Sequence, residues 1–252
     1  MKHLPHESGT ISTAEFVAEC RDMMIPLGES LSYFSVVPLD ERETQRLVLD
    51  PAGALPPRVC EILPNLRLIL VPYLALDFNG GSSRALVAFQ PPAEEEQLYV
   101  AMESLADENC LFIAMLDEEF YDTHIVLYRA LAQEIVQRGG ADFARSFNEA
   151  LDSELRGRAN GEVHERAWRL KRDYLQVKRP GSDRDEVLAE YRQQALEDTL
   201  TLYLHGLCCD IEVDAGPKQL PSKLMRKRLL LLKDQLPPPA AVALFPEDLD
   251  LV

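Results

Sequence analysis

The sequence predicts an α+β protein in which an N-terminal mixed sheet with flanking helices precedes a mostly helical C-terminal half. Short runs of β-branched, aromatic and aliphatic residues, bounded by proline and glycine, recur through residues 1–116. Beyond them, apolar residues recur every three or four positions over long stretches. We therefore expect a strand-rich part at 1–116, a helical part at 117–236 and a proline-led acidic tail at 237–252, joined in one continuous globular unit.

The composition is ordinary for a folded protein, except for its excess of acidic residues. Hydrophobic residues make up 46% of the 252 positions and charged residues 27%. The 42 acidic and 26 basic residues give a formal net charge of −16, which repels phosphate backbones, so we expect no nucleic-acid partner. Five irregularly spaced cysteines do not indicate a disulfide framework. No apolar run approaches the ~18 residues of a membrane span, and we expect a reduced, cytoplasmic protein without membrane contact.

The first elements follow from local signals. A helix is expected at residues 12–24, because its Ser-Thr-Ala-Glu opening has the pattern of a capping box. Strands are expected at 31–37 and 46–49, which are rich in β-branched and aromatic residues and bounded by prolines. Residues 56–62 predict a short helix, since proline is tolerated in a first turn.

The next elements surround an interrupted apolar run. Residues 66–76 predict a strand that ends, bulges or lies at an edge at Pro72, because proline cannot donate to a ladder. The following Asn-Gly-Gly-Ser-Ser sequence predicts a hairpin turn into a strand at 84–89. The acidic start of residues 94–106 predicts a helix. Residues 110–116 predict a buried strand.

The strongest helical pattern in the middle of the chain lies at residues 118–138. Leu127, Leu131 and Ile135 recur one turn apart, with further apolar residues beside them. A helix that is apolar around most of its circumference is largely buried. A Gly-Gly pair ends it where a left-handed residue is favoured.

A narrow polar stripe interrupts this apolar surface. Gln133 and Gln137 lie one turn apart with Glu134 beside them, in the pattern Gln-Glu-x-x-Gln. The spacing is that of His-Glu-x-x-His, in which two imidazoles bind zinc and the glutamate acts as general base. Amide oxygens are poor zinc ligands, so we expect neither a metal nor another cofactor. The alternative is that the stripe is only the polar face of an amphipathic helix.

The remaining helices are expected at residues 142–155, 185–207 and 222–236. In the last of them, basic residues 226–228 should occupy one side and leucines the other. The segment 156–179 holds eight Lys and Arg residues, and we expect it to face acidic groups of the same protein, with an anionic partner as the alternative. The acidic tail either docks on the body or binds a partner.

The helix at 185–207 carries a second pattern. In zincins of the anthrax-lethal-factor type, the His-Glu-x-x-His helix is followed by a helix resembling Glu-Phe-Phe-Ala-Glu-Ala-Phe-x-x-Tyr-Leu, whose inner glutamate is the third zinc ligand. Aligned on its Tyr-Leu ending, Asp198 falls at the ligand position and Glu197 lies next to it. Residues 108–236 therefore resemble a zincin-like fold of this type.

The resemblance implies a metallopeptidase fold without its activity. Gln133 and Gln137 stand where the family has histidines, and Asp198, beside Glu197, stands at the third ligand. Glu134 keeps the general-base position but has no metal-bound water to activate. The resemblance thus implies a proteolytically inactive, zincin-like binding or interaction module, with a protein or peptide as its partner.

Two other functions stay open. One is an interaction or scaffold protein of unrelated α+β fold, acting through the basic segment 156–179 or the acidic tail. The other is an enzyme in which Glu134, Glu197 and Asp198 converge as an acid–base cluster. No Ser-His-Asp order, phosphate loop, dinucleotide fingerprint or spaced Cys/His set supports catalysis, so the sequence favours a binding protein.

Overall fold

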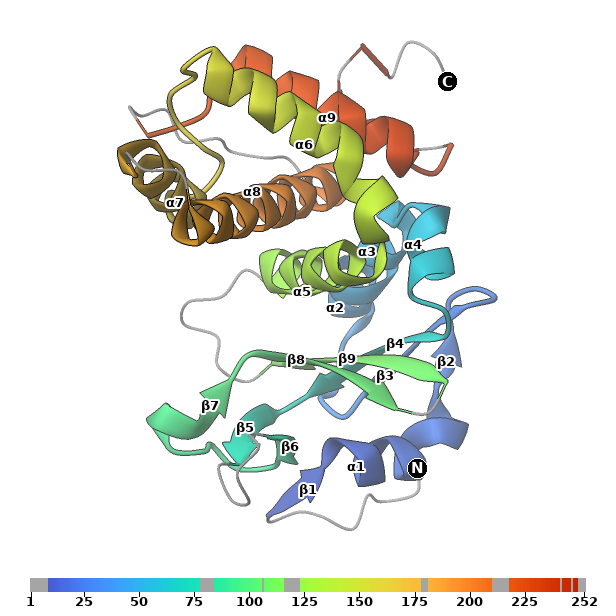
Figure 1. Ribbon diagram of the computed structural model, residues 1–252. Helices are drawn as coiled ribbons and strands as arrows, with labels where there is room; N and C mark the ends of the chain where they lie inside the picture. The colour runs from blue at the N-terminus through green and yellow to red at the C-terminus, as the bar shows by residue number, and fades with distance from the viewer. Residues whose placement is uncertain are drawn as a thin grey trace. The chain divides into compact units, whose positions relative to one another are not determined.

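The computed structural model describes residues 9–77, 84–105, 107–115, 123–177, 181–209, 218–240, 242–245 and 247–248. It is an α+β structure with two sheets and a mostly helical C-terminal half, which confirms the predicted fold class (Figure 1). The chain divides into two compact units. The first comprises Met1–Gly53 and Leu63–Ala130, and the second comprises Ala54–Ile62 and Leu131–Val252.

A five-stranded mixed sheet organises the first unit, in the order β2-β3-β4-β9-β8. Its strands are β2 (Ile25–Pro26), β3 (Leu31–Ser35), β4 (Leu66–Val71), β9 (Glu108–Ala114) and β8 (Val100–Leu105). The three inner strands run parallel, and the two edge strands pair antiparallel to them. The inner strands β4 and β9 are almost wholly buried, which is why their sequences are continuous apolar runs.

The second sheet is antiparallel, in the order β1-β6-β5-β7. Its strands are β1 (Thr10–Ser12), β6 (Arg84–Ala88), β5 (Tyr73–Asp77) and β7 (Gln97–Leu98). The predicted break at Pro72 is confirmed, and the two halves of the interrupted run enter different sheets as β4 and β5. Pairing of Asp77 with Arg84 confirms the hairpin, whose turn at 79–83 lies outside the described residues.

Helix α1 (Thr13–Cys20) packs against the hydrophobic core of the first unit. The Ser12 Oγ accepts a hydrogen bond from the amide of the third helical residue at 3.2 Å, which confirms the predicted cap, and a 3-10 turn follows the helix. Phe16 is fully buried, and its ring centroid lies 6.2 Å from that of Phe34 and 6.3 Å from that of Phe112. Aromatic packing therefore fastens α1 onto the mixed sheet.

The strand predicted at 46–49 is wrong. These residues lie in a helical segment that runs through α2 (Glu41–Thr44), a π-helical turn (Gln45–Leu49) and α3 (Asp50–Ala54). Asp40 opens the segment with a capping box, donating and accepting hydrogen bonds with the third helical residue. The cap nucleates a helix just before residues 46–49. Continuing this helix is more favourable than the strand conformation that residues 46–49 prefer by themselves.

The helix predicted at 94–106 is also wrong. A 3-10 turn (Glu94–Glu96) leads into β7 and β8, and β8 pairs with β9 along its whole length. The backbone hydrogen bonds of an available buried neighbour strand outweigh the helical propensity of the acidic stretch.

The second unit is helical, as predicted. It contains α4 (Pro57–Ile62), the C-terminal half of α5 (Thr123–Arg138), α6 (Gly140–Arg156), α7 (Glu165–Gln176), α8 (Ser182–Cys208) and α9 (Ser222–Gln235). Helix α7 packs along α8, and α9 packs against both α6 and α8 (Figure 1). Residues 118–122, predicted as the start of α5, lie outside the described part of the chain. No helix in that part is both long and apolar enough to cross a membrane.

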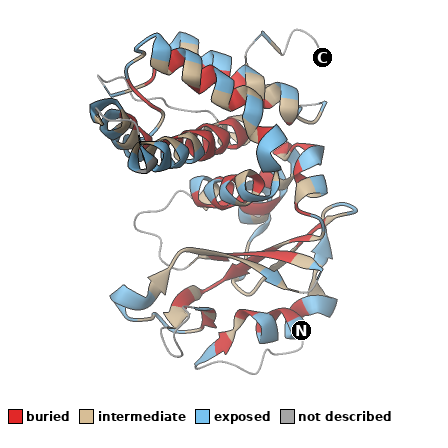
Figure 2. Cartoon of the chain, in the orientation of Figure 1, coloured by how far each residue is buried: buried red, intermediate tan, exposed pale blue. Residues whose placement is uncertain are grey.

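Buried residues follow α8 along much of its length (Figure 2), and a buried charge network lies beside it. Arg228 of α9, predicted on the basic side of this helix, is fully buried. Its Nη2 lies 2.5 Å from Oε2 of Glu154, and its Nη1 lies 2.7 Å from Oε2 of Glu162. Lys171 Nζ and the Tyr191 hydroxyl also donate to Glu162, at 2.9 and 2.6 Å. Two cations thus balance two carboxylates, which lowers the cost of burying them.

The described part of the tail docks on α9. Arg226 forms an ion pair with Glu247, and its guanidinium carbon lies 4.1 Å from the centroid of the Phe245 ring. Lys233 Nζ lies 2.7 Å from Oδ1 of Asp248. Of the two possibilities for the tail, the structure therefore shows docking on the body.

Candidate functional site

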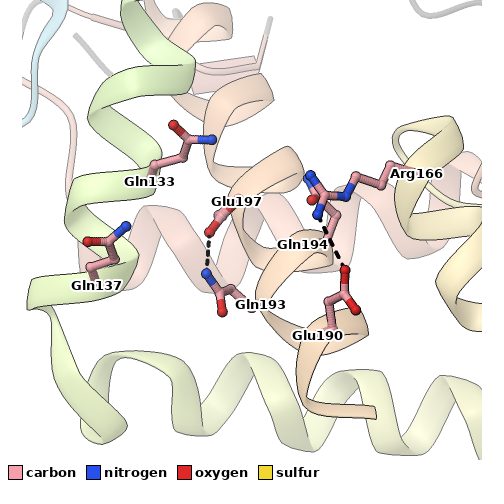
Figure 3. Close-up of a pocket in the computed structure, with 7 residues that line it drawn as sticks. All are labelled: Gln133, Gln137, Arg166, Glu190, Gln193, Gln194 and Glu197. Carbon is pink, nitrogen blue, oxygen red and sulfur yellow. Dashed lines mark hydrogen bonds and ion pairs between the residues drawn. The ribbon is translucent and has the colours of Figure 1, made fainter. Parts of the chain in front are cut away.

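A pocket of about 350 Å³ lies within the second unit, among α5, α7 and α8. It is lined by Gln133 and Gln137 of α5, by Arg166 of α7, and by Glu190, Gln193, Gln194 and Glu197 of α8 (Figure 3). Its volume is at the lower end of the roughly 300–1,000 Å³ that is usual for small-molecule sites. Unlike most such sites, its lining side chains are all polar or charged.

Helix α5 contributes its polar stripe. Gln133 and Gln137 are exposed, whereas Leu131, Ala132 and Ile135 around them are 0–1% exposed and belong to the core. Residues one turn apart share a face, so the two amides lie one above the other. Figure 3 shows both side chains extending from α5 toward α8.

Helix α8 contributes four residues at positions i, i+3, i+4 and i+7, namely Glu190, Gln193, Gln194 and Glu197. This spacing selects one helix face. Glu197 is only 7% exposed, and its Oε1 accepts a hydrogen bond from Gln193 Nε2 at 2.8 Å. Gln194 Nε2 donates to Asp198 in the same way, at 2.9 Å. Both α8 glutamines are therefore oriented by carboxylates one turn further along.

Arg166 contributes the cation in the lining. It lies in the first turn of α7, which is capped by His164, whose ring nitrogen Nδ1 accepts a hydrogen bond from the Arg166 amide at 3.5 Å. The Arg166 Nη2 lies 3.3 Å from Oε1 of Glu190, and both side chains are more than half exposed. Solvent screens such a pair, so it adds little stability, but it neutralises the Glu190 side of the pocket.

The structure brings three of the five predicted site residues together. Gln133, Gln137 and Glu197 line the pocket. Glu134 lies on the same helix but pairs with Arg138, at 2.8 Å. Asp198 is buried and accepts from Gln194. Neither Glu134 nor Asp198 is among the residues that line the pocket, so Glu197, rather than Asp198, meets the two glutamines there.

Four lining residues were missed by sequence reasoning: Arg166, Glu190, Gln193 and Gln194. A signal for three of them is present in the sequence, since they recur with Glu197 at i, i+3, i+4 and i+7 and therefore share one face of the helix. Arg166 carries no such signal, because its position beside α8 depends on how two helices pack.

The donor set does not fit a zinc ion. Zinc sites are built from Cys, His and carboxylate ligands, whereas the lining offers Gln133 and Gln137 amides and a Glu197 carboxylate that already accepts a hydrogen bond. Amide oxygens suit harder cations than zinc. The three carboxylates considered as an acid–base cluster also have separate partners, because Glu134 bonds to Arg138, Glu197 to Gln193 and Asp198 to Gln194.

Comparisons of the chain with protein-family models, with curated proteins and with solved structures find no match.

Proposed function

We propose that the chain is a proteolytically inactive, zincin-like binding protein whose pocket among α5, α7 and α8 takes a polar group of a protein or peptide. One observation carries the proposal. Gln133 and Gln137, which stand at the two histidine positions of the resemblance, line one pocket with Glu197, which adjoins the aligned third-ligand position.

The chemistry of the lining supports binding over catalysis. Glu134, at the general-base position, is held by Arg138 on its own helix and lies outside the lining. The pocket instead presents amide groups, each of which both donates and accepts hydrogen bonds without changing its charge. Such a lining recognises a polar ligand by its pattern of donors and acceptors.

Restoring the two histidines tests the zincin-like geometry. In the double variant Gln133→His, Gln137→His, two imidazoles one turn apart and the Glu197 carboxylate make a three-ligand site. We expect about one zinc ion per chain, measured by mass spectrometry of the metal content after dialysis. The unaltered chain should retain no stoichiometric zinc, because its amides are poor zinc ligands.

Two further variants identify the third ligand. Adding Glu197→Gln to the double variant should weaken zinc binding roughly 100-fold, because it removes a ligand. Adding Asp198→Asn instead should change the affinity little, because Asp198 is outside the lining. A double variant that is folded by circular dichroism yet takes up no zinc would refute the zincin-like geometry. The reverse ranking of the two additions would favour Asp198, as in the sequence alignment.

The alternative, an interaction through the basic segment 156–179, has less support. Arg166, Arg169 and Lys171 each pair with a glutamate of the same unit. Their charges therefore serve internal contacts, as the sequence predicts.

A further inference from the structure

We infer that the polar group taken by this pocket is an organic cation, the ammonium or guanidinium of a basic side chain, with Glu197 as its counter-ion. The inference rests on the proposed function, because it names the ligand chemistry of the same pocket. It goes beyond that function by assigning a charge to the ligand and a role to one carboxylate.

The charges of the lining do not cancel. Arg166, the cation of the lining, pairs with Glu190 at 3.3 Å, and no ion pair among the described residues joins it to Glu197. The hydrogen bond that the described residues give to the Glu197 carboxylate comes from a neutral amide, that of Gln193. A carboxylate that is only 7% exposed and is held by an amide is stabilised when a cation enters beside it.

The amides of the lining offer hydrogen-bond acceptors to a cation. Gln193 and Gln194 each donate Nε2 to a carboxylate one turn along α8. Their carbonyl oxygens are thereby left as acceptors, because the two ends of an amide point apart. Gln133 and Gln137 add two more amides from α5, whose nitrogens face α8 in Figure 3 and whose oxygens would face it after a half-turn of the amide. An ammonium has three N–H donors and a guanidinium has five, with no acceptor, so these groups match such a lining.

Size and overall charge point to the same class of ligand. A pocket of about 350 Å³ accommodates a single side chain or a small amine, rather than a long segment. The formal net charge of −16 attracts cations over a distance and repels anions. An anionic ligand would also meet Glu190 and Glu197 inside the pocket.

The test follows the side-chain NH₂ resonances of the four lining glutamines in the full-length, ¹⁵N-labelled chain by nuclear magnetic resonance. The probes are the N-acetyl amides of lysine, arginine, glutamine and glutamate, together with butylamine, methylguanidine and calcium chloride. We expect saturable shifts with the two basic amides, with dissociation constants in the millimolar range. The neutral and acidic amides should bind at least about tenfold more weakly. Butylamine and methylguanidine show whether the cation suffices without peptide groups.

Two charge-neutralising variants locate the counter-ion. Glu197→Gln keeps the shape of the side chain and should weaken the basic amides about tenfold or more. Glu186→Gln, at an exposed position of α8 outside the lining, should leave their affinity within about twofold. Circular dichroism of both variants checks that the fold is retained.

Four outcomes would overturn the inference and separate it from the proposed function. If the acidic and basic amides bound equally well, the pocket would bind ligands without a preference for cations. If the Glu197→Gln variant bound the basic amides as tightly as the unaltered chain, Glu197 would not be the counter-ion. Saturation by calcium at lower concentrations than by any amine would replace the organic cation with a metal ion. If no probe caused a shift, the pocket would not bind an organic cation. The zinc test on the histidine double variant would then decide the proposed function by itself.

Discussion

At the scale of single residues, Glu162 is buried in the second unit against two cations and a phenol. Burial alone would raise its pKa, but hydrogen bonds and charge attraction from Arg228, aided by Lys171, hold the pKa below its ordinary value of 4.5. Burial raises the pKa of the neighbouring Tyr191 hydroxyl, and the Glu162 charge adds to this. The phenol therefore remains a hydrogen-bond donor.

The lowered pKa makes the stability of the second unit depend on pH. The folded chain binds fewer protons at Glu162 than the unfolded chain does, so this carboxylate contributes stability above its unfolded pKa and loses it as pH falls through the folded pKa. Glu162→Gln should lower the free energy of unfolding at neutral pH by about 3 kcal/mol, because Arg228 and Lys171 lose a buried partner. The difference from the unaltered chain should shrink below pH 4.5. Urea denaturation across this range measures both.

Glu165→Gln is the matched control. Hydrogen bonds from Lys218 and Arg169 also lower the pKa of Glu165, but this side chain is exposed. Solvent screens exposed pairs, so its replacement should change unfolding little at any pH. Equal effects of the two substitutions would show that burial does not set the strength of the Glu162 contacts.

At the scale of elements, the loop between α6 and α7 holds Glu162 in place. The Glu162 amide donates to the Lys218 carbonyl at 2.8 Å, and the Leu220 amide donates to the Glu162 carbonyl at 3.1 Å. This pairing brings the backbone of Gln219 against Gly161, which has φ +82°. Only glycine combines this left-handed conformation with so close an approach of backbone.

Gly161→Ala should therefore destabilise the second unit. A Cβ at this position would overlap the Gln219 carbonyl, so the loop must shift and carry Glu162 away from Arg228. We expect the free energy of unfolding to fall by about 2 kcal/mol or more. Thermal denaturation followed by circular dichroism measures the loss.

Gly181→Ala provides the comparison. Gly181 is extended, and among the described residues, its chain neighbours aside, no heavy atom lies within 4 Å of a Cβ built there. This variant should be as stable as the unaltered chain, or slightly more so, because alanine reduces the freedom of the unfolded chain. A Gly161→Ala variant that matches it would mean that the loop accommodates a side chain without cost.

At the scale of the whole molecule, the described part of the tail contributes surface contacts but no buried residues. Leu236 is fully buried, and the Tyr203 hydroxyl donates to its carbonyl. After it, the described residues are half-buried or exposed. The Arg226–Glu247 pair, with side chains about half exposed, is of the kind that contributes at most about 1 kcal/mol.

Ending the chain after Pro239 should leave the fold intact. We expect the free energy of unfolding to change by about 1 kcal/mol or less, because the described residues beyond Pro239 are exposed or half-buried and their ion pairs lie near the surface. In the same shortened chain, Leu236→Ala should cost about 2–5 kcal/mol, since it opens a cavity in the core. Calorimetry of both chains makes the comparison. Unfolding caused by the truncation itself would assign the tail to the core.

Much of the fold could be predicted because its signals are local. The cap at Ser12, the break at Pro72 and the helical period of α6, α8 and α9 act over a few residues, and the structure confirms each of them. The errors at 46–49 and 94–106 arose where a preceding cap or a neighbouring strand outweighed local propensity.

The candidate site was predictable only in part. The spacing of Gln133 and Gln137 placed them on one face, and the structure finds both in the pocket with Glu197. Arg166 joins them through the packing of α7 along α8. No spacing within a single helix predicts such a neighbour.

By itself, the sequence determined the α+β class, most element positions and the polar stripe on α5, because caps, prolines and apolar periods act within one or two turns of chain. The tertiary structure alone decided that Glu197 faces the pocket while Asp198 does not, and that Arg228 is buried while Arg226 is exposed. The physical reason is that adjacent residues on a helix point in different directions. Which of those directions meets a partner depends on the packing of helices that are far apart in the sequence.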